Sequence, residues 1–361
     1  MANNNKHTGP NVPALRFPEF SGEWEEKCLG DISENISSGK TKSTTTGGKY
    51  VLIGSTGVIG NTSYADYSGN LILVARVGAN AGLINYYSGD CGITDNTLII
   101  KPLEQENNFC HYVYHYLKHC NLNQFVFGSG QPLITGGMLK RLPIRYGTAD
   151  EINKLSSLFD LLDARIEAQS KIIEEQETLL KSLADKLFLQ NNHSCQLSEL
   201  VNIVKGKQIN ADTLSETGDY YVMNGGITPS GYYSEYNVPA GAISISEGGN
   251  SCGYVQFNEK PFWSGGHCYS LQCRTNLVDY KYIYYYLKTK EADVMALRIG
   301  SGLPNIQKKD IEKFTISYPS LQSQKQFVKA LDALSEKINT EKHLLEKYCQ
   351  QKSYLLSQMF I

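Results

Sequence analysis

The chain has 361 residues, of which 41% are hydrophobic and 19% are charged, and this balance excludes a chain that is disordered throughout. Its length predicts two or more domains. The formal net charge of −2 excludes a protein that binds nucleic acid through an overall positive charge, so any DNA contact must use locally placed Lys and Arg or a basic partner.

Residues 1–147 are expected to form a first globular domain, in which residues 1–13 are polar and disordered. The runs KYVLIG (49–54), NLILVARVG (70–78) and NTLIIKP (96–102) are rich in β-branched residues and end at glycine or proline, which predicts strands. The run FCHYVYHYLK (109–118) predicts a helix. These elements indicate a small α+β domain.

Residues 148–190 are predicted to form one long spacer helix. Thr148 followed by Glu151 matches a capping box at its start. Apolar residues then recur every 3.5 residues on average, which predicts a coiled coil. The expected core positions are Phe159, Leu162, Ile166, Ile173, Leu180, Leu183 and Leu187.

Residues 191–319 are expected to form a second α+β domain on the same plan. YYVMNGG (220–226) and GAISISEGG (241–249) predict strands, and YKYIYYYLKTK (280–290) predicts a helix. Residues 320–361 then predict a second spacer helix. Its expected coiled-coil core positions are Leu331, Leu334, Ile338, Leu345, Tyr348 and Leu355.

The two halves are similar at an offset of about 171 residues. YVYHYLK (112–118) returns as YIYYYLK (282–288), and GSGQPLI (128–134) returns as GSGLPNI (300–306). The order domain, helix, domain, helix predicts that the helices pair antiparallel and that the halves are related by an approximate two-fold. A two-fold suits a reader of duplex DNA. A helical hairpin made only for stability or dimerisation is the plainer alternative.

No catalytic motif stands out. The sequence lacks a GxxxxGK[ST] phosphate loop and the Asn-Pro-Pro or Asp-Pro-Pro run of amino-methyltransferases, so we predict no catalysis by this chain alone. His111, His115 and His119 recur every four residues and could hold zinc on a helix face. The second half has Lys281, Tyr285 and Thr289 at these places, which favours a structural face over a metal site.

Several stretches resemble the specificity subunits of type I restriction-modification enzymes. The opening LRFPEFSGEWEEKCLGDISENISSGKT (15–41), RVGANAG (76–82) and GSGQPLI carry the likeness in the first half. QLSELVNIVKGK (196–207), EGGNSCGYV (247–255) and YPSLQSQKQFVKALDALSEKI (318–338) carry it in the second. Each motif is short and rich in glycine, whereas their repeated order is specific.

The resemblance implies a non-catalytic subunit of the bacterial cytoplasm in which each domain is a target recognition domain for double-stranded DNA. The paired helices would act as a spacer and as the dock for two methyltransferase subunits, and restriction/translocase subunits would complete the enzyme. S-adenosylmethionine, ATP and Mg would be cofactors of those partners, with none in this chain and no membrane partner. A coiled-coil scaffold that never reads DNA remains an alternative, which the near-neutral domains favour.

Polar side chains on glycine-rich loops are the candidates for DNA contact, because such loops expose hydrogen-bonding groups and let the backbone approach phosphates. For each of them, a turn residue without a ligand is the alternative. In the first domain they are Lys40, Lys42, Thr45, Arg76, Asn80, Thr94, Asn96, Ser129, Gln131, Lys140 and Arg141. In the second they are Lys205, Lys207, Asn224, Asn250, Ser251, His267, Ser301, Asn305, Lys308 and Lys309.

Matching places in the two domains carry different side chains. Arg76 corresponds to Glu247, Asn96 to His267 and Gln131 to Leu303. Different donors and acceptors at the same place predict two different half-sites and therefore an asymmetric bipartite target.

Overall fold

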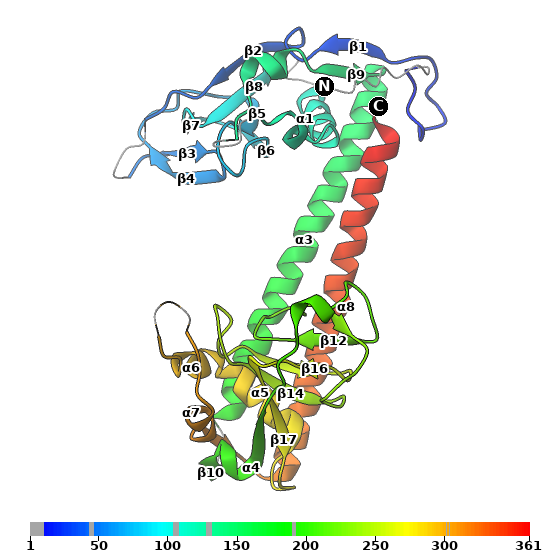
Figure 1. Cartoon of the computed structure of the whole chain (residues 1–361). Coiled ribbons are helices and arrows are strands. Elements are labelled where there is room, and N and C mark those ends of the chain that lie inside the picture. The colour runs from blue at the N-terminus through cyan, green and yellow to red at the C-terminus, as the bar shows by residue number, and fades with distance from the viewer. Residues whose placement is uncertain are drawn as a thin grey trace. The chain divides into compact units, whose positions relative to one another are not determined.

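The computed structural model describes residues 11–42, 47–103, 108–127, 132–189, 193–300, 302 and 304–361. The chain divides into two compact units, of which unit 1 comprises Met1–Ser170 and His343–Ile361 and unit 2 comprises Lys171–Lys342. Each unit holds one globular head and one part of each of two long helices, α3 and α8 (Figure 1). Secondary structure therefore follows the predicted order of domain, helix, domain, helix.

The head of unit 1 contains two sheets and a helix. A four-stranded antiparallel sheet has the order β2-β8-β5-β6, and a three-stranded sheet has the order β4-β3-β7 with β3 and β7 parallel. β1 pairs antiparallel with β9. The strands are β1 (Glu25–Cys28), β2 (Ser33–Ser38), β3 (Tyr50–Gly54), β4 (Gly57–Thr62), β5 (Asn70–Ala75), β6 (Ile84–Ser88), β7 (Cys91–Ile93), β8 (Thr97–Pro102) and β9 (Pro143–Tyr146).

Helix α1 (Phe109–His119) covers the larger sheet of unit 1. Tyr112 and Tyr116 on this helix are fully buried, and the aliphatic run of β5 is buried as well, which is why these two stretches form the core of the head. The shorter helices of this head are η1 (Leu122–Phe125) and α2 (Gly136–Lys140).

The head of unit 2 repeats this plan strand for strand. Its four-stranded antiparallel sheet has the order β11-β17-β14-β15, its three-stranded sheet the order β13-β12-β16 with β12 and β16 parallel, and β10 pairs antiparallel with β18. The strands are β10 (His193–Gln196), β11 (Val201–Lys205), β12 (Tyr220–Met223), β13 (Tyr232–Tyr233), β14 (Ala242–Ser246), β15 (Val255–Asn258), β16 (Trp263–Ser264), β17 (Cys268–Cys273) and β18 (Thr315–Tyr318).

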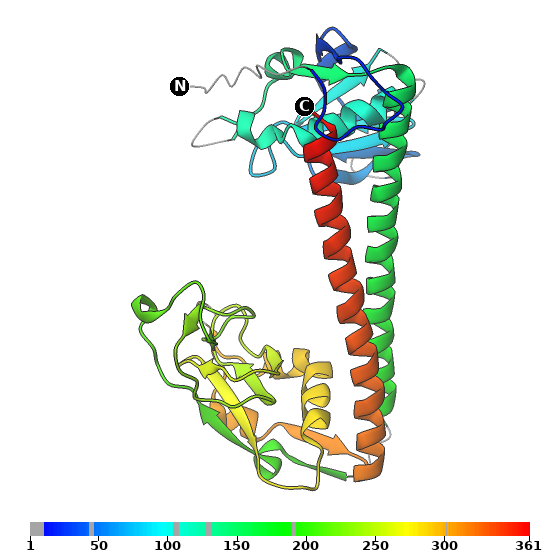
Figure 2. The same cartoon turned by 90° about the vertical axis from the view of Figure 1, so that its right-hand side faces the viewer.

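Helix α5 (Tyr280–Thr289) takes the place of α1 in this head, and Figure 2 shows it in yellow beside the orange part of α8. The smaller helices are α4 (Leu197–Leu200), η2 (Ala211–Thr213), α6 (Glu291–Ala296) and α7 (Lys308–Glu312). The α+β class predicted for both domains is confirmed. The predicted strand over residues 70–78 ends earlier, at Ala75, because the chain turns there and Gly78 adopts a φ of 81°.

The long helices are α3 (Ala149–Phe188) and α8 (Leu321–Met359), and they run antiparallel within each unit. In unit 1, Arg165 donates to the hydroxyl of Tyr348 over 2.5 Å, while the Phe159 and Phe360 rings lie 5.3 Å apart. In unit 2, the Lys342 ammonium lies 2.6 Å from the Glu177 carboxylate. None of the described helices is long and apolar enough to cross a membrane.

The predicted coiled-coil positions on both helices are buried or half-buried, so the 3.5-residue pattern is confirmed. Phe159 and Leu331 are 0% and 1% exposed and belong to the cores of their heads as well as to the helix pair. The pattern did not identify Ala184, Phe188 and Gln324, which are also buried because the head of unit 2 covers them.

Two predictions are wrong in part, the capping box at the start of α3 and the disorder of residues 1–13. The Glu151 N–H lies 3.4 Å from the Thr148 hydroxyl, but the Glu151 carboxylate pairs with Arg16 over two 2.7 Å hydrogen bonds and does not cap the helix. Glu151 is 1% exposed, and a buried carboxylate needs a charged partner.

Residues 11–13 are ordered, since the backbone N–H of Trp24 donates to the Asn11 carbonyl over 2.7 Å and Pro13 is buried. Residues 1–10 lie outside the described part.

Candidate nucleic-acid interface

Three loops meet at one edge of each head, and the same backbone hydrogen bonds hold them together in both. In unit 1, the Arg76 N–H donates to Asn96 O and the Ile134 N–H donates to Arg76 O, each over 2.9 Å. In unit 2, the Glu247 N–H donates to His267 O and the Ile306 N–H donates to Glu247 O, again over 2.9 Å. The correspondence of Arg76 with Glu247 and of Asn96 with His267 is therefore confirmed.

Four of the predicted DNA-contact residues of the first head line one cavity of about 680 Å³, which we call the first groove. Its lining residues are Lys40, Thr41, Lys42, Gly54, Ser55, Ile59, Thr94, Asp95 and Asn96. The exposed side chains of Lys40 and Lys42 flank the buried Thr41, whose N–H donates to Ile93 O over 2.9 Å.

Gly39 allows the segment before Thr41 to lie close to the backbone of Ile93. A Cβ on Gly39 would come within 2.3 Å of Ile93 O, so a larger residue would push the Lys40–Lys42 segment away from β7. Gly206 does the same in the second head, where a Cβ would lie 2.1 Å from Gly265 O. The Lys207 N–H donates to Ser264 O over 2.8 Å at this place, and its side chain is exposed.

The second head has a cavity of about 520 Å³ at the matching edge, which we call the second groove. Of the predicted residues, Asn224 lines it, and its Oδ1 accepts the His267 N–H over 3.1 Å. His267 is exposed beside this edge. Gln208, Asn210 and Ser230 add further polar groups to the lining.

The remaining predicted residues lie around these edges. Asn250 and Ser251 sit on the turn after Glu247, and Asn305 exchanges two backbone hydrogen bonds with Ile299. Lys308 and Lys309 are exposed on α7, where Lys308 lies 3.6 Å from Glu312.

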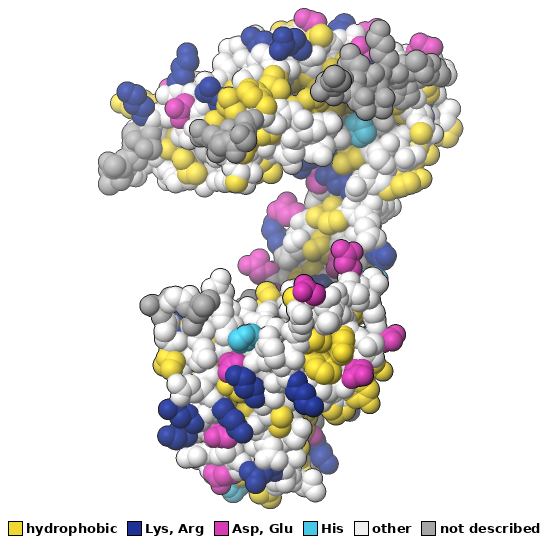
Figure 3. All heavy atoms as spheres, viewed as in Figure 1, with side chains coloured by type: hydrophobic (Ala, Val, Ile, Leu, Met, Phe, Trp, Pro, Cys, Tyr) yellow, Lys and Arg dark blue, Asp and Glu magenta, His cyan; other side chains and the backbone are white. Residues whose placement is uncertain are grey.

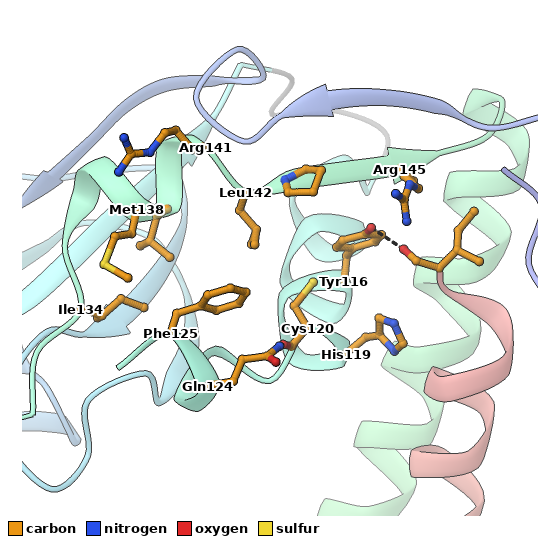
Figure 4. A pocket seen from close by; sticks show the side chains of 13 residues that line it. Tyr116, His119, Cys120, Gln124, Phe125, Ile134, Met138, Arg141, Leu142 and Arg145 are labelled. Atoms are coloured by element: carbon orange, nitrogen blue, oxygen red, sulfur yellow. Dashed lines mark hydrogen bonds between the residues drawn. The ribbon is translucent and has the colours of Figure 1, made fainter. Parts of the chain in front are cut away.

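Four predicted residues of the first head lie outside the first groove, and Arg76, which joins the three loops through its backbone, is one of them. Asn80 lines a separate cavity of about 440 Å³ together with Lys118. Lys140 is exposed at the end of α2, and Arg141 lines a cavity of about 630 Å³ with Tyr116, whose hydroxyl donates to Ile361 O over 2.5 Å (Figure 4). Thr45, Ser129, Gln131 and Ser301 lie outside the described residues.

Lys205 is paired with a buried carboxylate. Its ammonium lies 2.6 Å from Glu247 Oε1, which also accepts a hydrogen bond of 2.9 Å from the Tyr269 hydroxyl. Burial and the adjacent carboxylate raise the pKa of Tyr269. Glu247 is 5% exposed, and the Lys205 ammonium compensates its buried negative charge. The first head has Arg76 at this place.

Two of the three histidines, His111 and His115, face α3, whereas the His119 ring lies 5.9 Å from that of Phe360. His115 Nε2 and His111 Nδ1 both lie 2.8 Å from the carboxylate of Asp160. In unit 2, Lys281 and Tyr285 donate to Asp332 over 2.9 and 2.7 Å. Among the residues that the structure describes, no group of His, Cys, Asp and Glu is arranged to hold a metal ion. Both units therefore fasten the head helix to a long helix through one aspartate.

Sequence reasoning missed Ile59 of the first groove and Gln208 and Asn210 of the second. The turn Gly54–Gly57 could have indicated a hairpin whose edge lies beside Lys40. Gln208 and Asn210 follow Lys207 on the same loop. Figure 3 shows Lys and Arg side chains on the displayed face of each head, with Asp and Glu between them.

Two α+β heads of one plan, each carried by paired long helices and each presenting a different set of polar groups, define a duplicated recognition protein. Residues 21–178 and 191–347 each match the type I restriction modification DNA specificity domain. The chain therefore belongs to the family of type I restriction-modification specificity subunits. It is a DNA-specificity subunit, the non-catalytic member of such systems.

Similar proteins agree with this assignment. A Mycoplasma genitalium protein named as a type I specificity subunit is 25% identical over 306 residues, which cover 79% of each chain. A Mycoplasma pneumoniae protein with the same description is 33% identical over 169 residues, or 45% of each chain. The crystal structure of a type I restriction-modification S subunit from M. genitalium has the same fold, with a TM-score of 0.72 at 21% identity over 97% of this chain and 99% of that one.

Proposed function

We propose that this subunit selects an asymmetric bipartite duplex target, with one half-site read by each head. The observation that carries the proposal is the matched backbone framework of the two heads. The same hydrogen bonds hold Arg76 and Asn96 in one head and the buried Glu247 and the exposed His267 in the other. Because one framework carries different donors and acceptors, the two heads should prefer different bases.

The first groove is lined by the amide of Asn96 and by the exposed Lys40 and Lys42. Asn can make paired hydrogen bonds to adenine in the major groove, while Lys40 and Lys42 suit flanking phosphates. In the second head, the Oδ1 of Asn224 is already bound to a backbone N–H, which leaves its NH₂ group and the exposed His267 for reading. Lys207, Lys308 and Lys309 suit phosphates there.

The long helices are proposed to dock two methyltransferase subunits. Large apolar side chains lie outside the helix seam and in water, although burial would stabilise them. In unit 1 these are Leu161 and Tyr354, which are 70% and 62% exposed. In unit 2 they are Ile172 and Leu179, 41% and 56% exposed and seven residues apart, so they lie on one face of α3. Such a stripe fits the apolar face of a partner helix.

The chemistry is proposed to reside in the partners. S-adenosylmethionine would be bound by the methyltransferase subunits, and ATP and Mg by restriction/translocase subunits that complete the enzyme in the bacterial cytoplasm. The role of this chain is to position those subunits on one sequence.

Methylation mapping tests the proposal. The chain and its methyltransferase partner are expressed in a host that lacks both, and long-read sequencing locates the modified bases. We expect one bipartite, non-palindromic motif that is absent when this chain alone is omitted. Methylation at a palindrome, or at scattered sites, would contradict two different heads.

Footprinting of the assembled complex separates this role from that of a scaffold. A reader with two heads should protect two patches with a gap between them. Partner assembly without any protection on the methylated motif would favour a coiled-coil scaffold, for which the net charge of −2 is the supporting observation.

A further inference from the structure

An exposed aliphatic edge borders the first groove. β3 and β4 form a hairpin in which Leu52 pairs with Gly60 and Ile53 pairs with Val58, so Ile59 is the extra residue of a β-bulge. A bulge redirects its side chain out of the regular alternation of the strand. Val58 and Ile59 are 64% and 53% exposed, an unusual position for two large aliphatic residues on one short strand.

The bulge places Ile59 among the polar residues of the first groove. Ile59 lines the same cavity as Lys40, Lys42 and Asn96. Gly54 leaves room for it, since a Cβ on Gly54 would come within 3.1 Å of the Ile59 Cγ2 atom. The groove therefore joins an amide, two ammonium groups and one aliphatic side chain.

Duplex DNA offers a partner for each of these groups in the first groove. The two ammonium groups attract phosphates, a two-stranded β-ribbon fits the major groove, and Asn pairs with adenine there. The apolar feature of that groove is the C5 methyl group of thymine. Asp95, which also lines the cavity, repels phosphate but can accept a hydrogen bond from cytosine, so this part of the groove suits base edges.

We propose that Ile59 contacts a thymine methyl group in the half-site read by the first head, next to the base that Asn96 reads. This inference rests on the proposed DNA-reading function and adds a specificity residue to it. The equivalent strand of the second head is β13, whose Tyr232 and Tyr233 are half-buried, so Ile59 has no aliphatic counterpart on that strand; Ile209 and Leu214 line the second groove from a different segment. The contact proposed for Ile59 therefore concerns the first half-site.

The test uses the complete complex with its methyltransferase subunits and a duplex that carries the mapped motif. Each thymine of the first half-site, on either strand, is replaced in turn by deoxyuridine, which lacks only the methyl group. We expect one position at which binding weakens about fourfold, the effect of losing one buried methyl group. Ile59→Ala should bind the thymine and deoxyuridine duplexes equally.

Two controls separate the possible failures. Ile227→Ala removes an aliphatic side chain of the second head that is 55% exposed, and it should leave the preference for thymine unchanged. Deoxyuridine in the second half-site should have no effect that Ile59→Ala alters.

The proposal is overturned if no thymine of the first half-site differs from deoxyuridine, if that half-site contains no thymine, or if Ile59→Ala keeps the preference. Failure of the wild-type complex to bind any bipartite motif would instead refute the DNA-reading function itself.

Discussion

Asp160 and Asp332 each fasten the helix of a head to a long helix, but they bind different side chains. Asp160 accepts from His111 and His115 in unit 1, whereas Asp332 accepts from Lys281 and Tyr285 in unit 2. Burial opposes ionisation of Asp160, yet the hydrogen bonds from His115 and His111 hold its pKa below the usual value. Only the unit 1 contact contains histidine side chains.

Acidification should therefore destabilise unit 1 through His115. Burial lowers the pKa of His115, which is 0% exposed, despite the opposing hydrogen bond to Asp160. The unfolded chain then binds the proton more readily, so stability is lost as the pH falls below about 6.5. Asp163, 3.9 Å from the ring, and Lys352 are the other charged groups nearby. Thermal unfolding at pH 7.5 and 5.5 measures this loss.

His115→Gln keeps a donor for Asp160 and does not titrate, so its melting temperature should change less between these two pH values than that of the wild type. His343→Gln, at an exposed histidine, serves as the matched control and should behave like the wild type. An equal pH effect in all three proteins would exclude His115 as the cause.

Substitutions in the first groove should distinguish a residue that binds phosphate from a residue that reads bases. Lys40→Ala should weaken binding to target and random duplexes alike and lower the slope of log K against log salt by about 0.9. Asn96→Ala should weaken target binding by about 1–3 kcal/mol and leave that slope unchanged. Binding titrations of the assembled complex at several salt concentrations measure both quantities.

Lys186→Ala, at an exposed lysine on α3, is the control for removing a positive charge far along the sequence from the loops. If Asn96→Ala weakened random and target duplexes equally, Asn96 would be a backbone contact and not a reader of bases.

Sequence alone named Lys40, Lys42, Thr94 and Asn96 among the candidates, because they lie on loops near glycine, and the structure places these four around one cavity. It did not predict Ile59, whose exposure depends on a bulge in strand register. Nor did it predict the pairing of Lys205 with Glu247, which joins loops 42 residues apart. Such contacts depend on three-dimensional packing that local patterns do not contain.

At the scale of elements, each long helix packs against the other long helix and also contributes to the core of a head. The 3.5-residue pattern on α3 was predictable because it depends only on which residues face the seam. The pattern did not reveal that Phe159 also packs into the head of unit 1, near Phe360 and His115. The capping box failed for a similar reason, since Arg16 competes for Glu151 from 135 residues away.

Phe159→Ala should therefore lower the free energy of unfolding by about 3–5 kcal/mol, because it opens a cavity shared by the helix pair and the head. Leu161→Ala on the same helix removes a side chain that is 70% exposed and should change stability by no more than about 0.5 kcal/mol. Guanidinium unfolding of the two variants compares these values. A similar cost for both would contradict the assignment of Phe159 to the core.

At the scale of the whole molecule, duplication lets one chain combine two specificities that change independently. Each head has its own core, its own sheets and its own groove, and the described contacts within each unit suffice to hold its loops. The sequence predicted this division from its internal repeat, because the repeat preserves buried tyrosines and turn glycines while the loop side chains differ.

Exchange of residues 193–318 for the equivalent segment of another specificity subunit should therefore change one half of the methylated motif and keep the other. The segment begins at β10 and ends at β18, which pair with each other, so the exchange carries a complete set of strands and leaves α3 and α8 intact. Long-read methylation mapping of cells that express the exchanged chain with the same methyltransferase partner measures the outcome. Exchange of residues 11–146 is the reciprocal control and should alter the opposite half. A motif that changed in both halves after either exchange would mean that the heads do not read independently.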